Sequence, residues 1–214
     1  NNNFYLVSAP GVERSVICVG ATKQEGETQR IAALSARGPS SPYSLLKPEI
    51  VAPGELIQSA KMGTGFEGSW LNGSSLSTAH VSGAAALALQ ARPNWSAAEI
   101  KALLLNTATP ISNEDGLVYP GSLAGAGFLD VAKAVKTSVT IMAEDSDGLT
   151  TLSLGSLALS KPTTITKNIR ITNYRNTSVL YEMAVEETVQ ESGFSVLLPL
   201  DQTVLVQANS HKIV

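Results

Sequence analysis

The chain has 214 residues, with 15 Lys plus Arg against 18 Asp plus Glu and a formal net charge of -3. This length supports one large domain or two modest ones, and the balance of charge lacks the basic patch that binding to nucleic acid requires, so we expect no nucleic-acid partner. Because 43% of the residues are hydrophobic and only 15% are charged, the composition predicts a packed globular fold.

Apolar runs and the rare residue types exclude several further classes. The longest apolar stretch, residues 81–89, is too short and too rich in alanine to cross a bilayer, so we expect no membrane span. Cys18 is the single cysteine, which excludes an internal disulfide and a cysteine-based zinc site. His80 and His211 are the only histidines and leave very little material for histidine-dependent chemistry. We expect no metal site and no cofactor.

The first third of the chain predicts short strands between turns. Residues 16–19, Val-Ile-Cys-Val, end at Gly20 and favour a buried parallel strand, with Cys18 in the core. Residues 24–30 are polar and predict a surface loop. Residues 50–52, Ile-Val-Ala, predict a second apolar strand that a Pro-Gly pair closes.

An alanine-rich segment, residues 75–91, predicts a helix. Apolar residues fall on every face of it between positions 84 and 89, so we expect a helix that is buried all round. Gly83 interrupts the pattern and is expected to mark close backbone packing, and Pro93 ends the helix.

Two further helices have cap signals. Ser96 followed by Glu99 forms a capping box that predicts a helix start, and the next apolar residues supply its buried stripe. Asp130 is expected to cap a short third helix over residues 131–135.

After Lys136 the hydrophobic pattern changes to period two. Residues 164–173, 179–185 and 203–206 predict antiparallel strands of a sandwich, although the tail is short for a complete one. We therefore predict three parts, namely an α/β part over 1–137, a linker over 138–150 and a partial β-sandwich over 151–214.

Ser75 is the strongest candidate for chemistry. It lies between a polar, glycine-rich loop and the start of the predicted helix, where unsatisfied N–H groups and the helix dipole favour negative charge. This position suits a nucleophile whose tetrahedral intermediate carries an oxyanion. From the pattern alone, an ordinary serine N-cap is the favoured alternative. The Gly-x-Ser-x-Gly elbow is absent, because Ser77 stands where its second glycine belongs.

Five ordered segments resemble the subtilisin-like serine proteases. Residues 72–83, Asn-Gly-Ser-Ser-Leu-Ser-Thr-Ala-His-Val-Ser-Gly, resemble the Gly-Thr-Ser-Met-Ala-Thr-Pro-His-Val-Ala-Gly signature around the nucleophile of that family. Residues 8–21, 34–39, 47–54 and 125–130 are similar to its pocket strands, its Phe-Ser-Ser-Arg-Gly-Pro turn, its Lys-Pro-Asp-Val-Val-Ala-Pro-Gly strand end and its Gly-x-Gly-x-Val-Asp segment. The resemblance implies an α/β fold, a partial subtilisin-like three-layer parallel sheet with helices, followed by a partial antiparallel β-sandwich.

The resemblance also implies roles for single residues. Ser75 matches the nucleophile and its backbone N–H one oxyanion donor, while Asn1 is a candidate for the other donor. Ser8 falls where the family lines its primary specificity pocket. His80 matches a signature histidine that is not the catalytic base, and we expect it to be structural. Five residues along a helix rotate by about 500°, which leaves Ser75 and His80 on different faces. The sequence departs from the signature at Ser74, Leu76, Ser77 and Ala79.

The Asp and His that the family carries ahead of its nucleophile are absent, since no Asp and no His precede Ser75. We therefore expect the nucleophile-bearing portion of a secreted, extracellular or cell-envelope endopeptidase, which cleaves polypeptide substrates through an acyl-enzyme but is inactive as an isolated chain. The expected partner is the missing N-terminal portion of the catalytic domain, or a second copy. The alternative is a non-catalytic scaffold or binding subunit, either a pseudoprotease or a processed fragment.

Several other motifs have both a functional and a simpler structural interpretation. Residues 144–148, Glu-Asp-Ser-Asp-Gly, are compatible with a calcium loop or a displaced Asp-Ser-Gly motif, but their spacing favours a solvated linker. His211 is expected at the surface, and residues 94–96 and 176–178 are glycosylation sequons of a kind that often occurs by chance. Residues 163–173 resemble the start of the fibronectin type III-like domains that follow many large subtilases.

Overall fold

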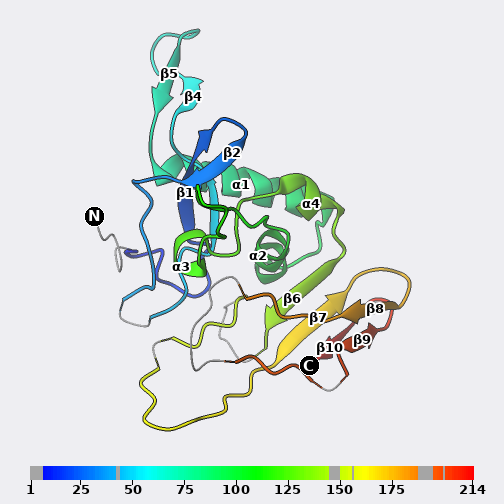
Figure 1. Ribbon diagram of the computed structural model, residues 1–214. Helices are drawn as coiled ribbons and strands as arrows, with labels where there is room; N and C mark the ends of the chain where they lie inside the picture. Colours follow the sequence, from blue (N-terminus) through cyan, green and yellow to red (C-terminus); the bar gives the residue numbers. More distant parts are fainter. Residues whose placement is uncertain (1–6, 42–43, 145–149, 156, 188–194, 200) are drawn as a thin grey trace.

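The computed structural model describes residues 7–41, 44–144, 150–155, 157–187, 195–199 and 201–214, so Asn1 and residues 145–148 lie outside the described residues. A mixed α/β part is followed by a smaller part made of strands (Figure 1). The elements in chain order are β1 (Val19–Glu25), β2 (Thr28–Ile31), β3 (Ile50–Pro53), β4 (Ile57–Ala60), β5 (Gly68–Leu71), α1 (Ser74–Ala91), α2 (Ala97–Asn106), α3 (Gly121–Ala124), α4 (Val131–Lys136), β6 (Val139–Ala143), β7 (Ile169–Asn173), β8 (Val179–Glu182), β9 (Thr203–Val206) and β10 (Ser210–Ile213).

The first sheet has the order β2-β1-β3. β1 pairs in parallel with β3, from Val19 opposite Ile50 onward, and antiparallel with β2. A parallel strand is present near the expected position, but β1 begins three residues later than predicted and continues to Glu25, so Cys18 lies just ahead of it and is only partly buried. The loop expected over residues 24–30 is instead a hairpin, because Gly26, with a φ of 60°, supplies the left-handed turn that joins β1 to β2.

α1 is buried on one face only, which corrects the expectation of a helix buried all round. Its buried residues recur at helical spacing and face β1, β3, α2 and α4: Ser77, Val81, Ala84 and Ala88. On the two sides of this buried stripe, Leu87 and Leu89 are 51% and 46% exposed. A Cβ added to Gly83 would meet no described atom within 4 Å, so the expected close packing at this glycine is wrong. The apolar composition would allow burial on every side of the helix, but neighbouring elements cover only one side of it.

Both predicted helix caps are confirmed. The Ser96 hydroxyl accepts a hydrogen bond from the N–H of Glu99, and the Glu99 carboxylate accepts one from the N–H of Ser96 at 2.7 Å, so the capping box begins α2. Asp130 accepts a hydrogen bond from the N–H of Lys133 at 2.8 Å and begins α4. These caps orient the helices over a core that joins α1, α2 and β3.

Beyond α4 the described chain forms two small antiparallel sheets, β10-β7-β6 and β8-β9. The strands expected from the period-two pattern are present as β7, β8 and β9, and their side chains meet in a core of Ile171, Val204 and Val206. β6 lies inside the range predicted as a linker, and the N–H of Ile141 donates to Asn106 at the end of α2 at 2.7 Å. The first of these sheets is therefore attached directly to the α/β part. The division into domains and the fibronectin type III-like assignment stay predictions.

Tyr174, which follows β7, joins the two parts of the chain. Its ring packs on Trp95 with the ring centroids 4.0 Å apart, and its hydroxyl donates a hydrogen bond to the Glu99 carboxylate. Burial and this hydrogen bond raise the pKa of Tyr174 to about 12. Partial burial raises the pKa of Glu99, but the hydrogen bonds from Tyr174 and Ser96 outweigh it and hold this pKa below its ordinary value.

We expect Tyr174→Phe to destabilise the protein by about 1 kcal/mol, the order of one hydrogen bond. The raised pKa of Tyr174 gives a contribution that is complete below its unfolded pKa of 10.0 and is lost as pH rises to about 12. The lowered pKa of Glu99 gives a contribution that is present above its unfolded pKa of 4.5 and is lost as pH falls. The difference in Tm between wild type and Tyr174→Phe should therefore be largest from roughly pH 5 to 9.5 and shrink on either side.

Tyr181→Phe is the matched control for this measurement. The Tyr181 hydroxyl is buried and has no hydrogen-bond partner among the described residues, so its removal should leave Tm unchanged or slightly higher. Equal losses in the two variants at neutral pH would show that the bond between Tyr174 and Glu99 contributes nothing to stability.

Candidate active site

Ser75 is the second residue of α1 and is exposed at the start of the helix. The N-cap residue is Gly73, so the interpretation of Ser75 as an ordinary serine N-cap is wrong. Within the described chain no side chain caps this end of α1, and its first turn carries no acidic residue. The positive end of the helix dipole is therefore left to act on negative charge that develops beside Ser75.

The turn ahead of Ser75 is anchored to the end of β3. The N–H of Gly73 donates to the carbonyl of Gly54 at 2.7 Å. Asn72 accepts a hydrogen bond from the N–H of Leu56, also at 2.7 Å. Ser75 is thus held at the carboxyl end of a parallel strand pair, the edge at which α/β proteins place their ligand sites.

Gly54 has no room for a side chain. A Cβ at this position would lie 2.2 Å from the Ser77 hydroxyl oxygen, 2.8 Å from the Ala21 Cβ and 3.0 Å from the Gly73 carbonyl oxygen. Ser77 is fully buried, and its hydroxyl has no hydrogen-bond partner among the described residues. Sequence reasoning noted both glycines as strand or loop ends but missed that their contact sets the position of Ser75.

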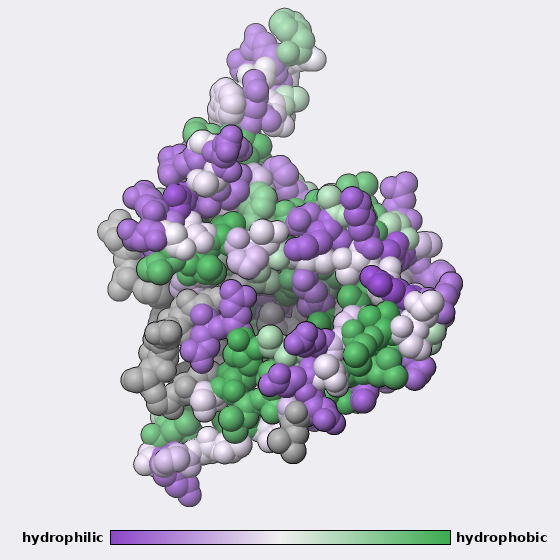
Figure 2. Space-filling view, turned by 45° about the vertical axis from the view of Figure 1, so that its right-hand side comes forward, coloured by the Kyte–Doolittle hydropathy of each residue, from purple (hydrophilic) through white to green (hydrophobic). Residues whose placement is uncertain are grey.

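The segment between β3 and α1 is a β-hairpin rather than the polar loop expected. β4 and β5 pair antiparallel, and the hairpin stands clear of the body (Figures 1 and 2). An ion pair of 2.7 Å between Lys61 and Glu67 lies near its tip, where Met62 and Phe66 are almost fully exposed. Neither strand has a buried residue, so their sequences carry no core-facing apolar pattern that would indicate a strand.

The structure does not bring the other predicted site residues to Ser75. His80 is exposed, and its Nδ1 lies 2.8 Å from the Leu76 carbonyl oxygen. It follows Ser75 by about 7.5 Å along the helix and about 140° around it. His211 is exposed on β10, at the far end of the molecule from the hairpin that leads into α1 (Figure 1). Ser8 is exposed in the segment ahead of β1, and its pocket role, like the structural role of His80, stays a prediction.

Other candidate nucleophiles and ligands have different surroundings. Burial raises the pKa of the Cys18 thiol to about 11, so this thiol stays protonated near neutral pH. Glu144, the described end of the acidic loop, binds the guanidinium of Arg170, with Nε 2.7 Å from Oε2. Across the described ranges, no group of three or more His, Cys, Asp or Glu is placed to hold a metal ion. Over the same ranges, no helix has the length and apolar character needed to cross a bilayer.

The mixed α/β body places a serine at the start of a helix beside the end of a parallel strand, a position that suits a nucleophile. Residues 1–165 match the Peptidase S8 subtilase family, and the chain belongs to this family. It is similar to Minor extracellular protease Vpr of Bacillus subtilis (strain 168), with 32% identity over an alignment 214 positions long that covers 92% of this chain and 25% of the relative.

Two further comparisons agree with the family. Subtilisin BL of Lederbergia lenta is 33% identical over 136 residues, which cover 64% of this chain and 44% of that protein. The solved structure of the CspB protease of Clostridium perfringens superposes with a TM-score of 0.53 at 27% identity, over 62% of this chain and 29% of that chain. The chain thus spans less than half the length of each of these relatives.

Proposed function

We propose that the chain is the nucleophile-bearing part of a secreted subtilisin-like serine endopeptidase that hydrolyses polypeptide substrates through an acyl-enzyme at Ser75. The observation that supports this most directly is the exposed Ser75 at the uncapped N-terminus of α1, held by the hydrogen bond from Gly73 to Gly54. An extracellular or cell-envelope location agrees with the name of the relative from Bacillus subtilis.

In this reaction the Ser75 oxygen attacks the carbonyl carbon of the scissile peptide bond while a base takes its proton. The oxyanion that forms accepts a hydrogen bond from the N–H of Ser75, with Asn1 as the proposed second donor, and the helix dipole favours the same charge. The base then gives its proton to the leaving nitrogen, the C–N bond breaks, and the amine departs to leave an ester on Ser75. Water hydrolyses this ester to the acid and restores the Ser75 hydroxyl. Ser8 would line the pocket for the substrate side chain.

The isolated chain is proposed to be inactive, because neither of its histidines reaches Ser75. His80 bonds back to its own helix, and His211 belongs to the sheet at the other end of the molecule. A serine hydroxyl without a base is a poor nucleophile, so only the slow rate supported by binding and oxyanion contacts would remain.

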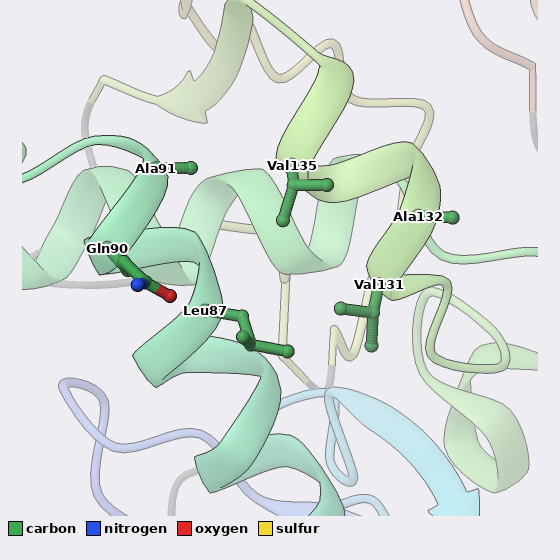
Figure 3. Close-up of a pocket in the computed structure, with 6 residues that line it drawn as sticks. All are labelled: Leu87, Gln90, Ala91, Val131, Ala132 and Val135. Carbon is green, nitrogen blue, oxygen red and sulfur yellow. The ribbon is translucent and has the colours of Figure 1, made fainter.

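The uncovered face of α1 supports association with another polypeptide segment. Leu87 extends from α1 toward Val131 on α4, and together with Val135 they line a shallow apolar groove of about 530 Å³ (Figure 3). Leu89 is also exposed, but it lies about 200° around the helix from Leu87 and outside this groove. We propose that the part of the catalytic domain that carries the Asp and the His covers this face, and that a second copy replaces it when the chain is alone. The same face would also suit a non-catalytic scaffold subunit, the second candidate function.

Labelling with a fluorophosphonate probe tests the proposal. The isolated chain should not label at a useful rate, whereas the chain joined to, or mixed with, the segment that carries the catalytic Asp and His should label. Ser75→Ala should abolish this labelling, and Ser82→Ala, at an exposed serine on the same helix, should leave it intact. A complex that assembles tightly and never labels would favour the scaffold function, and labelling that persists in Ser75→Ala would identify a different nucleophile.

A further inference from the structure

Three charged side chains are buried together where β1, β3 and α2 meet, away from Ser75. Glu49, the residue before β3, lies 2.9 Å from Lys47 Nζ through one carboxylate oxygen and 2.8 Å from Lys101 Nζ through the other. These residues are between 0% and 3% exposed. One carboxylate thus serves two ammonium groups, which leaves an excess of positive charge that needs further acceptors.

Those acceptors are backbone carbonyls of a single loop. Lys47 Nζ donates to the carbonyl of Glu13 at 2.7 Å. Lys101 Nζ donates to the carbonyls of Arg14 at 2.6 Å and Val16 at 3.0 Å. The two lysines come from different parts of the fold, the segment before β3 and helix α2, and they bind the same short stretch of backbone.

Glu49 holds the end of this loop as well. Its carboxylate accepts the N–H of Cys18 at 3.1 Å, and its own N–H donates to the Cys18 carbonyl at 2.8 Å. Residues 7–18 belong to no described helix or strand, because β1 begins at Val19. Side chains of the triad (Lys47, Glu49 and Lys101) therefore hold residues 13–18, together with the single backbone bond from Glu49 to Cys18.

The held carbonyls connect to Ser8 through one turn. The N–H of Glu13 donates to the carbonyl of Pro10 at 3.0 Å. Gly11 packs so closely that a Cβ there would lie 3.1 Å from both the Ser8 carbonyl oxygen and the Cys18 sulfur. A shift at residues 13–16 would therefore be passed on to Ser8.

We propose that Lys47, Glu49 and Lys101 are positioning residues for the substrate pocket, because they hold the backbone of residues 13–18 and through it the segment that carries Ser8. The proposal rests on the proposed function for the pocket role of Ser8. It predicts that the two ends of β3 have different roles. Lys47 and Glu49 lie before the first residue of the strand, whereas Gly54, which holds the turn ahead of Ser75, follows the last. Weakening the contacts of Lys47, Glu49 and Lys101 at the start of β3 should change substrate selection more than the reactivity of Ser75.

Lys101→Met tests whether the triad positions residues 8–18 without affecting Ser75, because it removes the ammonium group and keeps most of the side-chain volume. Hydrogen exchange of the chain itself should show amides of residues 8–18 exchanging about tenfold faster, with less than about a twofold change in α1 and β3. Lys136→Met, at an exposed lysine of α4, is the matched control and should leave exchange unchanged. In the complemented protease, the ratio of kcat/KM for two peptides that differ only before the scissile bond should change about fivefold or more, while fluorophosphonate labelling changes less than twofold.

Lys101→Gln is the second variant, because it keeps N–H donors without the charge and should restore part of the protection at residues 8–18. Exchange that rises equally in all segments, or that does not rise at residues 8–18, would overturn the positioning role. If the complemented wild type never labels, the proposed function fails, and the exchange pattern still decides whether the triad holds this segment.

Discussion

Replacing Glu49 by Gln should destabilise the protein by about 3–5 kcal/mol, the range observed when one partner of a buried ion pair is removed. The amide has the shape of the carboxylate but no charge, so the ammonium groups of Lys47 and Lys101 lose their shared counter-charge while they stay buried. Denaturant unfolding of the two proteins at neutral pH measures the difference.

The loss should depend on pH in a defined direction. Burial lowers the pKa of Lys101, with Glu49 opposing this effect, so removing the carboxylate should lower that pKa further. A lysine whose folded pKa lies below its unfolded value of 10.5 destabilises the folded state while it is protonated. The deficit of Glu49→Gln should therefore be complete while folded Lys101 stays protonated, and it should shrink as the pH rises from the lowered folded pKa toward 10.5.

Glu67→Gln is the matched control, because Glu67 forms an ion pair of the same kind with Lys61, but on the exposed hairpin. Exposed pairs contribute little, and this variant should change stability by no more than about 0.5 kcal/mol. Similar losses for the two substitutions would show that the buried triad contributes no more than a surface pair.

Gly54→Ala should lower both stability and the reactivity of Ser75. The added Cβ must displace the Ser77 hydroxyl, the Ala21 Cβ or the Gly73 carbonyl, all of which lie within 3.0 Å of it. Overpacking of this kind costs about 1–3 kcal/mol. Because the Gly73 carbonyl belongs to the turn that positions Ser75, fluorophosphonate labelling of the complemented protein should fall by about a hundredfold, the effect of a displacement near 1 Å.

Two companion variants separate packing from other effects of this substitution. Ser77→Ala removes the shortest contact, at 2.2 Å, and should be neutral or stabilising by itself because the buried hydroxyl has no partner among the described residues. Combined with Gly54→Ala it should recover part of the lost stability and labelling. Gly83→Ala, on the open face of α1, should stabilise by about 0.5–1 kcal/mol through helix propensity alone. Normal labelling of Gly54→Ala would show that this contact does not position Ser75.

Local signals in the sequence predicted those features that depend on neighbouring residues. The capping box of Ser96 and Glu99 and the cap of Asp130 are formed within one helical turn, and the structure has both. The apolar run at 50–52 predicted β3 because a buried parallel strand needs little more than β-branched and apolar residues in sequence. Five ordered motifs likewise indicated the subtilase family that residues 1–165 match.

The sequence predicts loops in place of the hairpins and a fully buried α1, and both predictions are wrong for a different reason. β2, β4 and β5 have no buried residue, so a turn and pairing with a partner strand define them rather than an apolar pattern of their own. The alanine-rich helix has apolar residues on all sides. Such a composition shows which surfaces can be buried, but it does not show which neighbouring elements cover them.

The sequence by itself therefore determined the family, the candidate nucleophile Ser75 and the elements whose hydrogen bonds close within a few residues. Tertiary structure alone decided that Gly54 packs against Ser77, and that Glu49 binds Lys101 from a distant helix as well as Lys47 beside it. Those contacts join residues that no local pattern relates. They exist because β1, β3, α1 and α2 come together around one core, and only that arrangement brings the side chains within reach of one another.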